Sequence, residues 1–380
     1  MAAGSAGKAS GVAATLVVTL LCAAVYTGIV VYNYDPDTFL FGDSPYYAAA
    51  SASLIGDHDL KLRNNLRGSD ARHATMVAIG ADGEWRPKHP VLMSVVAIPF
   101  LFAFGVKGLL VLNLTVMTAL VALCHRLGLR SSASWASSAA TITTALFSFV
   151  VAYAYNYSPD AFAALPAVAS VLLLWSSWPV AAGLLAGAAF AAKPAHVVFV
   201  VLAFVGAWAR GGRRQALRFA AGVAPWVVVV MVYNLVLFGG VATFGYDRIF
   251  DPDAPGGITT QRTDFSLSAI PENLVAQIAD SRRGLLPTAP SVLLALAGLP
   301  FLFARDRTLA LLCAALTTSY LIFFSAFLPW MASHAGNRYL FVPVLLSAVP
   351  LAALFDRLGR LGEPVPIRVG SPSAASIPVP

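Results

Sequence analysis

Two aspartates have the sequence context best suited to a catalytic role. Asp43 directly precedes a Ser-Pro pair that starts a helix expected over residues 45–55, with Ser44 as its N-cap. Asp160 lies in the stretch NYSPDAF, ahead of another expected helix. A carboxylate held next to a substrate hydroxyl accepts its proton, which is general-base chemistry. Capping a helix is the simpler role for either aspartate, and the local sequence leaves both roles open.

Three cations occur where a phosphate could be bound. Lys88 and Arg338 lie at the ends of apolar segments, and Lys193 lies between two short ones in AAFAAKPAHVV. Cations stabilise the negative charge that develops on a departing phosphate. Charged residues at the ends of membrane spans also serve as anchors, with the charged group reaching the lipid headgroups. We expect the three side chains to converge on one cavity if they bind phosphate.

Histidines and further arginines accompany these cations. His89 follows Lys88 directly and His334 is close to Arg338, so we expect both histidines to contact substrate. The histidines have no metal-ligand spacing, and we expect no bound metal. The adjacent pair Arg282 and Arg283 in DSRRGLLP faces either the site or the headgroups.

The composition assigns these residues to a membrane protein. Of the 380 residues, 58% are hydrophobic and 11% are charged, too few to cover a water-soluble globule. The net charge of +7 arises from arginines in short clusters between apolar segments. Membrane topology explains such clusters, and we expect no nucleic-acid partner. No stretch has the context of a nucleotide-binding loop, and we expect no cofactor.

The apolar segments define the expected topology. They cover residues 11–33, 91–105, 107–124, 133–155, 161–177, 179–192, 194–209, 219–238, 288–304, 308–328 and 339–355. A full crossing needs about 20 apolar residues, so the segment at 91–105 is short. If that segment is re-entrant or interfacial, the arginine clusters at 125–130, 210–218 and 305–307 all fall on the cytoplasmic side. Ten spans then remain, with both termini cytoplasmic.

This topology predicts one transmembrane domain with its active site outside. Residues 34–90 and 239–287 become long outer loops of a domain that covers residues 1–356. Fifteen of the eighteen acidic residues fall on the outer side, which indicates a local use for carboxylates there. Residues 357–380 are rich in Pro and Ser without apolar periodicity, and we predict a disordered cytoplasmic tail. The expected location is the inner (plasma) membrane.

Several stretches resemble the GT-C superfamily of polyprenyl-phosphate-dependent glycosyltransferases, which includes protein O-mannosyltransferases and lipid A aminoarabinose transferases. GDSPYYAAASASLIGDHDLKLRNN is similar to the acidic motif that opens the family's first outer loop. RPKHPVL is similar to the motif that closes that loop, and Asp160 to an aspartate of a second loop. Later stretches, such as HAGNRYLFVPVLLSAVP, are similar to bacterial members. The family's Asp-Glu pair is Asp43-Ser44 here, and Val91 replaces a proline.

The resemblance implies an all-α polytopic fold with about 10–11 transmembrane or re-entrant helices. It also implies transfer of a sugar from a polyprenyl-phosphate donor to an acceptor hydroxyl, with inversion at the anomeric carbon. Asp43 is then the base and Asp160 a supporting carboxylate. The implied substrate-binding residues are Lys88, His89, Lys193, His334 and Arg338. The acceptor is open between a glycan, a lipid and a protein, and the alternative function is a transporter or flippase for a lipid-linked sugar.

Overall fold

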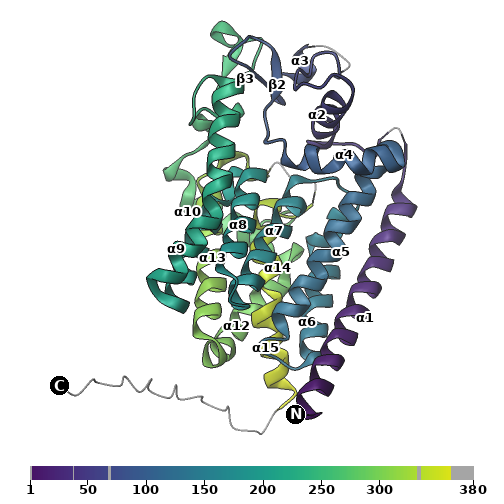
Figure 1. Cartoon of the computed structure of the whole chain (residues 1–380), viewed down its shortest axis with the longest axis vertical. Helices are drawn as coiled ribbons and strands as arrows, with labels where there is room; N and C mark the ends of the chain where they lie inside the picture. The colour runs from purple at the N-terminus through teal and green to yellow at the C-terminus, as the bar shows by residue number, and fades with distance from the viewer. Residues whose placement is uncertain (1, 37, 67–69, 332–334, 361–380) are drawn as a thin grey trace, which may run out of the picture.

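The long apolar stretches of the sequence form helices that run side by side (Figure 1). The structure is a computed structural model, and it describes residues 2–36, 38–66, 70–331 and 335–360. The helices are α1 (Ala2–Asn33), α2 (Ser44–Gly56), α3 (Asp70–His73), α4 (Leu92–Phe104), α5 (Gly108–Gly128), α6 (Ser134–Leu146), α7 (Pro159–Trp175), α8 (Pro179–Ala192), α9 (Val197–Phe238), α10 (Ile270–Ala279), α11 (Leu285–Thr288), α12 (Pro290–Arg305), α13 (Arg307–Ser325), α14 (Phe341–Leu346) and α15 (Ala348–Leu358).

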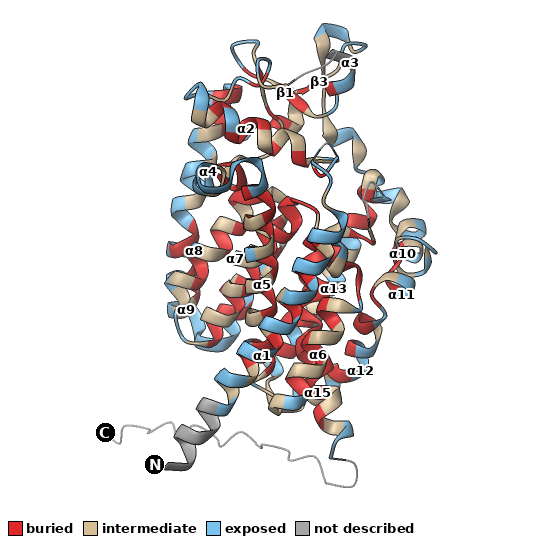
Figure 2. Cartoon of the chain, turned by 90° about the vertical axis from the view of Figure 1, so that its right-hand side faces the viewer, coloured by how far each residue is buried: buried red, intermediate tan, exposed pale blue. Residues whose placement is uncertain are grey.

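The expected membrane fold is confirmed. Within the described residues, five helical stretches are long and apolar enough to cross a membrane. Large apolar side chains also face outward along the bundle, including Leu16, Val17 and Leu20 of α1, which are 58%, 66% and 67% exposed. Buried residues lie in the middle of the bundle (Figure 2). Apolar side chains on the outside of a bundle of this size are compatible with lipid as the surrounding solvent.

Helix α9 consists of two helices joined by a tight turn. Gly211 and Gly212 leave the helical conformation, and Gly212 has a φ of 63°, which favours glycine. Helix α8 packs closely on the second half of α9, where a Cβ added to Gly183 would lie 1.9 Å from the Phe219 carbonyl oxygen. The arginine cluster expected at 210–218 therefore occupies this turn and the start of the second half.

Helix α4 lies across one end of the bundle, while its successor α5 runs along the bundle (Figures 1 and 2). The two helices are separated by a break at Gly105, which has a φ of 58°. The orientation of α4 agrees with the prediction that the segment at 91–105 does not cross the membrane fully. The first long segment, with α2 and α3, and the part of the second segment that carries β3 gather at the same end of the bundle, which we call the loop end, whereas α10 lies beside the bundle (Figures 1 and 2).

A small sheet at the loop end joins these two segments. Its strand order is β2–β1–β3–β4, with antiparallel pairing throughout, and the strands are β1 (Val77–Ile79), β2 (Trp85–Pro87), β3 (Ile249–Phe250) and β4 (Ile258–Thr259). Ala78 pairs with Ile249 across the two segments, and the Ile79 amide donates to the Arg248 carbonyl at 2.8 Å. The sheet was not predicted, because strands of two or three residues have no detectable alternation.

The three arginine clusters meet at the opposite end of the bundle. Arg210 Nη1 lies 3.7 Å from Asp306 Oδ2, and Arg305 Nη1 lies 2.7 Å from Asp356 Oδ2. Arg305 also donates to the Ser131 carbonyl at 2.6 Å, next to the first cluster. The predicted tail begins inside α15, which continues to Leu358, and residues 361–380 lie outside the described part of the chain.

Candidate active site

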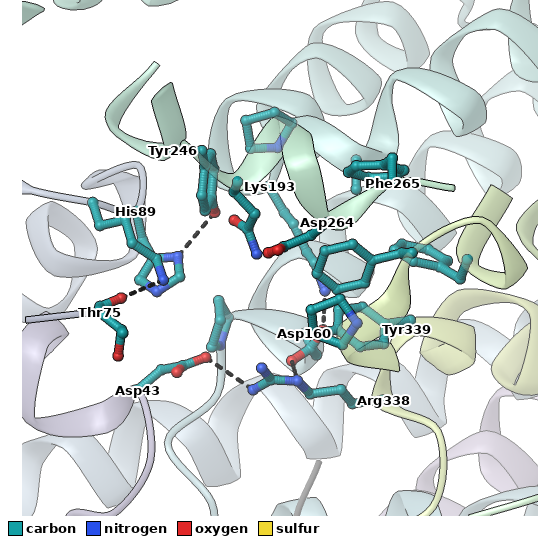
Figure 3. A pocket seen from close by; sticks show the side chains of 18 of the residues that line it. Asp43, Thr75, His89, Asp160, Lys193, Tyr246, Asp264, Phe265, Arg338 and Tyr339 are labelled. Atoms are coloured by element: carbon teal, nitrogen blue, oxygen red, sulfur yellow. Dashed lines mark hydrogen bonds and ion pairs between the residues drawn. The ribbon is translucent and has the colours of Figure 1, made fainter. Parts of the chain in front are cut away.

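A cavity of about 930 Å³ lies at the loop end and brings distant parts of the chain together (Figure 3). Six of the seven candidate residues line it, namely Asp43, Lys88, His89, Asp160, Lys193 and Arg338. The seventh, His334, lies outside the described residues. The expectation that Lys88, Lys193 and Arg338 share one cavity agrees with this geometry, whereas their chemical role stays a prediction.

Asp43 does not cap helix α2 with its side chain. It occupies the N-cap position, but its carboxylate makes no capping hydrogen bond. The prediction that Ser44 caps this helix is wrong, because Ser44 is already helical and its hydroxyl donates to the Tyr157 carbonyl at 2.8 Å. The Asp43 carboxylate instead accepts a hydrogen bond from Arg338, with 2.8 Å between Nη1 and Oδ2. This aspartate is therefore directed at the cavity by an ion pair.

Asp160 lies in the first turn of α7, where Ser158 is the cap. The Ser158 hydroxyl accepts a hydrogen bond from the Asp160 amide at 3.2 Å, so the carboxylate of Asp160 is not needed for capping. That carboxylate is only 2% exposed and forms an ion pair with Lys193. Its other oxygen lies 3.9 Å from Arg338 Nε.

Lys193 lies where α8 ends in extended backbone before Pro194. Its ammonium group lies 4.8 Å from the centroid of the Tyr339 ring, and the Arg338 guanidinium carbon lies 5.3 Å from the same ring. Asp43, Arg338, Asp160 and Lys193 thus form a continuous row of alternating charge, which we call the charge row. Both cations of this row face carboxylates, and phosphate binding by Arg338 and Lys193 stays a prediction.

Arg338 is held in place from two sides. It opens the short 3₁₀ helix η9 (Arg338–Leu340), which Asn337 caps by accepting a hydrogen bond from the Tyr339 amide at 3.2 Å. The buried Asn337 amide group also donates to Gln277 of α10 at 2.9 Å. Within the described residues, Arg338 Nε is buried without a hydrogen-bond partner. Its anionic neighbour is Asp160 Oδ2, at 3.9 Å.

Lys88 and His89 directly follow strand β2. Lys88 Nζ donates to the Thr75 carbonyl at 2.6 Å, and no ion pair to Lys88 occurs in the described part of the chain. Burial lowers the pKa of Lys88 below its ordinary value, against the opposing charge of Asp43. The His89 ring stacks on Tyr47 with 5.5 Å between centroids, and its Nδ1 lies 2.9 Å from the Tyr246 hydroxyl. Burial lowers the pKa of His89 to about 3, so the ring is neutral at pH 7.

The protonation state of Asp43 follows from opposing influences. Burial alone raises the pKa of this carboxyl, since it disfavours the charged form. His89 when protonated, Arg338 and Lys88 act in the other direction, and together they lower the pKa to about 2. The carboxylate is therefore ionised across the physiological range.

Several cavity residues were not assigned from the sequence. Arg283 lines the cavity whereas Arg282 does not, which resolves the alternative that the sequence left open. Gln261, Asp264 and Phe265 line it from the second loop, where no periodic pattern drew attention to them. The aromatic residues of one wall are Phe265, Phe323, Phe324, Phe327 and Tyr339. The dense aromatic sequence FFSAF at 323–327 was the available signal.

The cavity combines groups that suit an amphiphilic anion. Lys88 and Arg283 contribute positive charge, and no ion pair to either side chain occurs in the described part of the chain. The aromatic wall offers apolar surface in the same cavity. A phosphate attached to an apolar chain matches both features, because cations bind its oxygens while the rings contact its hydrocarbon.

Comparison with known proteins supports the fold. No protein-family model and no curated protein sequence matches this chain. The crystal structure of the oligosaccharyltransferase of Archaeoglobus fulgidus, in the apo form, is similar with a TM-score of 0.56 at 11% sequence identity. The match covers 89% of this chain and 50% of that protein, so this chain spans about half the length of the archaeal one. The chain therefore has a polytopic membrane fold of the GT-C type.

Proposed function

We propose that this protein is a membrane glycosyltransferase that moves a sugar from a polyprenyl-phosphate donor to an acceptor hydroxyl. The observation that carries the proposal is the charge row, in which Asp43, Arg338, Asp160 and Lys193 line one cavity of a GT-C-type fold. A base and several cations within one cavity are what sugar transfer from a phosphate requires.

Asp43 acts as the base in the proposed reaction. It takes the proton of the acceptor hydroxyl as the acceptor oxygen bonds to the anomeric carbon. The bond from that carbon to the phosphate oxygen breaks, and its electron pair stays with the phosphate. The oxygen attacks from the face opposite the phosphate, so the configuration inverts. Asp160 supports the site by holding Lys193 and Arg338 in position.

Arg338 links the base to the leaving group. Its guanidinium donates to Asp43 and has an unpartnered Nε–H. When a departing phosphate gains charge, Arg338 shares its donors with the phosphate oxygens, and its hold on Asp43 weakens. The pKa of Asp43 then rises from about 2, which makes the carboxylate a better proton acceptor. Lys88 and Arg283 supply further charge to the phosphate.

The loop end faces the outside of the cell in this proposal. Support comes from the arginine clusters, which meet one another at the opposite end through Asp306 and Asp356. Positive residues are retained on the cytoplasmic side, which supports placing the cavity on the extracytoplasmic face of the plasma membrane. The donor reaches the cavity from the bilayer through its lipid tail.

The direct test uses purified protein in lipid nanodiscs with radiolabelled polyprenyl-phosphate pentoses and hexoses. Transfer of label from one of these lipids to a cell-envelope acceptor extract supports the enzyme. Movement of the intact labelled lipid across vesicle membranes without any transfer replaces the proposal with a flippase. Loss of a specific glycan or glycolipid from a deletion strain would identify donor and acceptor together.

A further inference from the structure

Two polar side chains of the second loop reach the cavity from a single turn of helix. Gln261 and Asp264 are the first and last residues of the 3₁₀ helix η6 (Gln261–Asp264), and both line the cavity. Side chains three residues apart eclipse one another in a 3₁₀ helix. The amide and the carboxylate are therefore presented together on one face of η6.

The side chains of Gln261 and Asp264 make few interactions with the described part of the chain. Among the described residues, the side chains of Gln261 and Asp264 have no hydrogen bond and no ion pair. The other cavity carboxylates are engaged, since Asp43 meets Arg338, Asp160 meets Lys193, and Asp247 meets Arg262. Asp264 therefore has no ion-pair partner among the described residues, in a cavity whose other acids are paired, and its charge acts on Lys88 by raising the pKa of that lysine.

The turn that carries these groups is fixed in position. Arg262, between them in sequence, donates to Asp247 through Nε at 2.5 Å and Nη2 at 3.0 Å. Thr260 caps η6 by accepting from the Arg262 amide at 3.2 Å, and the Thr263 hydroxyl donates back to the Thr260 carbonyl at 2.9 Å. A two-bond ion pair and a capped turn hold η6 without using Gln261 or Asp264. Their orientation toward the cavity is set before any ligand arrives.

An aromatic surface adjoins the two polar groups. Phe265 follows Asp264 directly and pairs through its backbone with Phe327. The two rings lie 5.1 Å apart, and both residues line the cavity. Phe265 is 45% exposed, so much of its ring is not covered by protein.

From this arrangement we infer that Gln261, Asp264 and Phe265 form a subsite for a sugar ring. A carboxylate accepts hydrogen bonds from two hydroxyls, an amide both donates and accepts, and an aromatic face packs on the C–H face of a pyranose or furanose. A free phosphate is disfavoured next to Asp264 because of its like charge. The assignment of this sugar to a transfer reaction rests on the proposed function, whereas the sugar binding itself does not.

The test measures binding of free methyl glycosides of mannose, galactose, glucose and arabinose by saturation-transfer NMR. The full chain is held in nanodiscs, because maltoside detergents carry sugars of their own. Saturable binding of at least one glycoside is expected, with roughly tenfold or greater weakening in Asp264→Asn and in Gln261→Ala, the loss that follows removal of a hydrogen bond involving a charged or buried partner. Asp253→Asn is the matched control, since it removes an exposed carboxylate of the same loop that does not line the cavity.

Absence of saturable binding by every glycoside, or equal binding by Asp264→Asn and the wild type, overturns the subsite. Where a donor and an acceptor turn over, a higher KM for the acceptor in Asp264→Asn assigns the subsite to the acceptor, and a higher KM for the donor assigns it to the donor sugar. Sugar binding without any transfer supports the subsite and contradicts the proposed glycosyltransferase function. Transfer without sugar binding supports the glycosyltransferase function and contradicts the subsite.

Discussion

Arg338 and Asp43 are 295 residues apart in the sequence, yet their side chains meet at 2.8 Å inside the cavity. The pair joins the start of the first long loop to the beginning of the last membrane segment. Neither residue has a reason to be buried there for packing alone, because a buried ion pair gives little net stability after its desolvation. The arrangement suits a substrate site. Both charges line the cavity, and each compensates the cost of burying the other.

The ion pair between Asp160 and Lys193 makes a prediction about stability. Replacing either residue alone, as Asp160→Asn or Lys193→Met, leaves a buried charge without its partner and should destabilise the protein by about 3–5 kcal/mol. The double variant should recover most of that loss. Thermal unfolding of the four proteins in nanodiscs measures this coupling. Additive losses in the double variant would show that the two charges do not depend on each other.

The pKa of Asp43 predicts how activity depends on pH. A carboxyl with its pKa lowered from 3.8 to about 2 stays ionised well below pH 5, so Asp43 should cause no fall in kcat/KM between pH 7 and pH 5. Arg338→Gln removes a cation that lowers this pKa, and the acid limb of the residual activity should move to higher pH. Arg338→Lys keeps the charge, and its acid limb should stay low. An unchanged acid limb in Arg338→Gln would disprove the electrostatic link.

The same shift has a consequence for stability. A carboxyl with a lowered folded-state pKa contributes stability above its unfolded-state pKa, and the contribution is lost as pH falls from about 4 toward 2. The difference in unfolding free energy between Asp43→Asn and the wild type should therefore become smaller as pH falls through that interval. Denaturation midpoints measured at pH 5 and pH 3 test the sign. A difference that grows on acidification would contradict it.

A close contact between the two loops predicts that adding one methyl group at Gly245 weakens donor binding. A Cβ at Gly245 would lie 2.5 Å from the Lys88 carbonyl oxygen and 2.9 Å from its Cα, so Gly245→Ala must displace the backbone that carries Lys88. Donor binding should weaken several-fold while the bundle stays folded. Gly56→Ala is the control, because a Cβ there meets nothing within 4 Å. Equal donor affinity in both variants would contradict the proposal that Lys88 binds the donor phosphate.

The orientation of the protein in the membrane can be determined by labelling engineered cysteines in intact cells. The three native cysteines are buried, so background labelling with an impermeant reagent should be low. Asp253→Cys, in the second loop, should react, and Arg214→Cys, in the arginine cluster of α9, should not. Reaction at Arg214→Cys without reaction at Asp253→Cys would invert the proposed topology.

The sequence predicted the parts of this protein that depend on long, local patterns. Apolar run length identified the bundle, and the balance of arginines identified α4 as a helix that does not run along it. Such patterns do not predict which single side chains are buried or paired. The ion pair between Asp160 and Lys193 is an example. The short strands and the turn with Gln261 and Asp264 have no periodicity, so only the folded chain shows where they face. The role of Ser44 was wrong because its hydroxyl found a partner more than a hundred residues away.

The most direct measurement compares sugar transfer by the wild type, Asp43→Asn and the control Asp253→Asn in nanodiscs with a labelled polyprenyl-phosphate donor. Asparagine keeps the shape of Asp43 but cannot take the acceptor proton. Transfer by Asp43→Asn should fall roughly 10²- to 10⁴-fold while donor affinity stays close to that of the control. Near-normal turnover by Asp43→Asn with both substrates present would contradict the account, because the charge row would then lack its base.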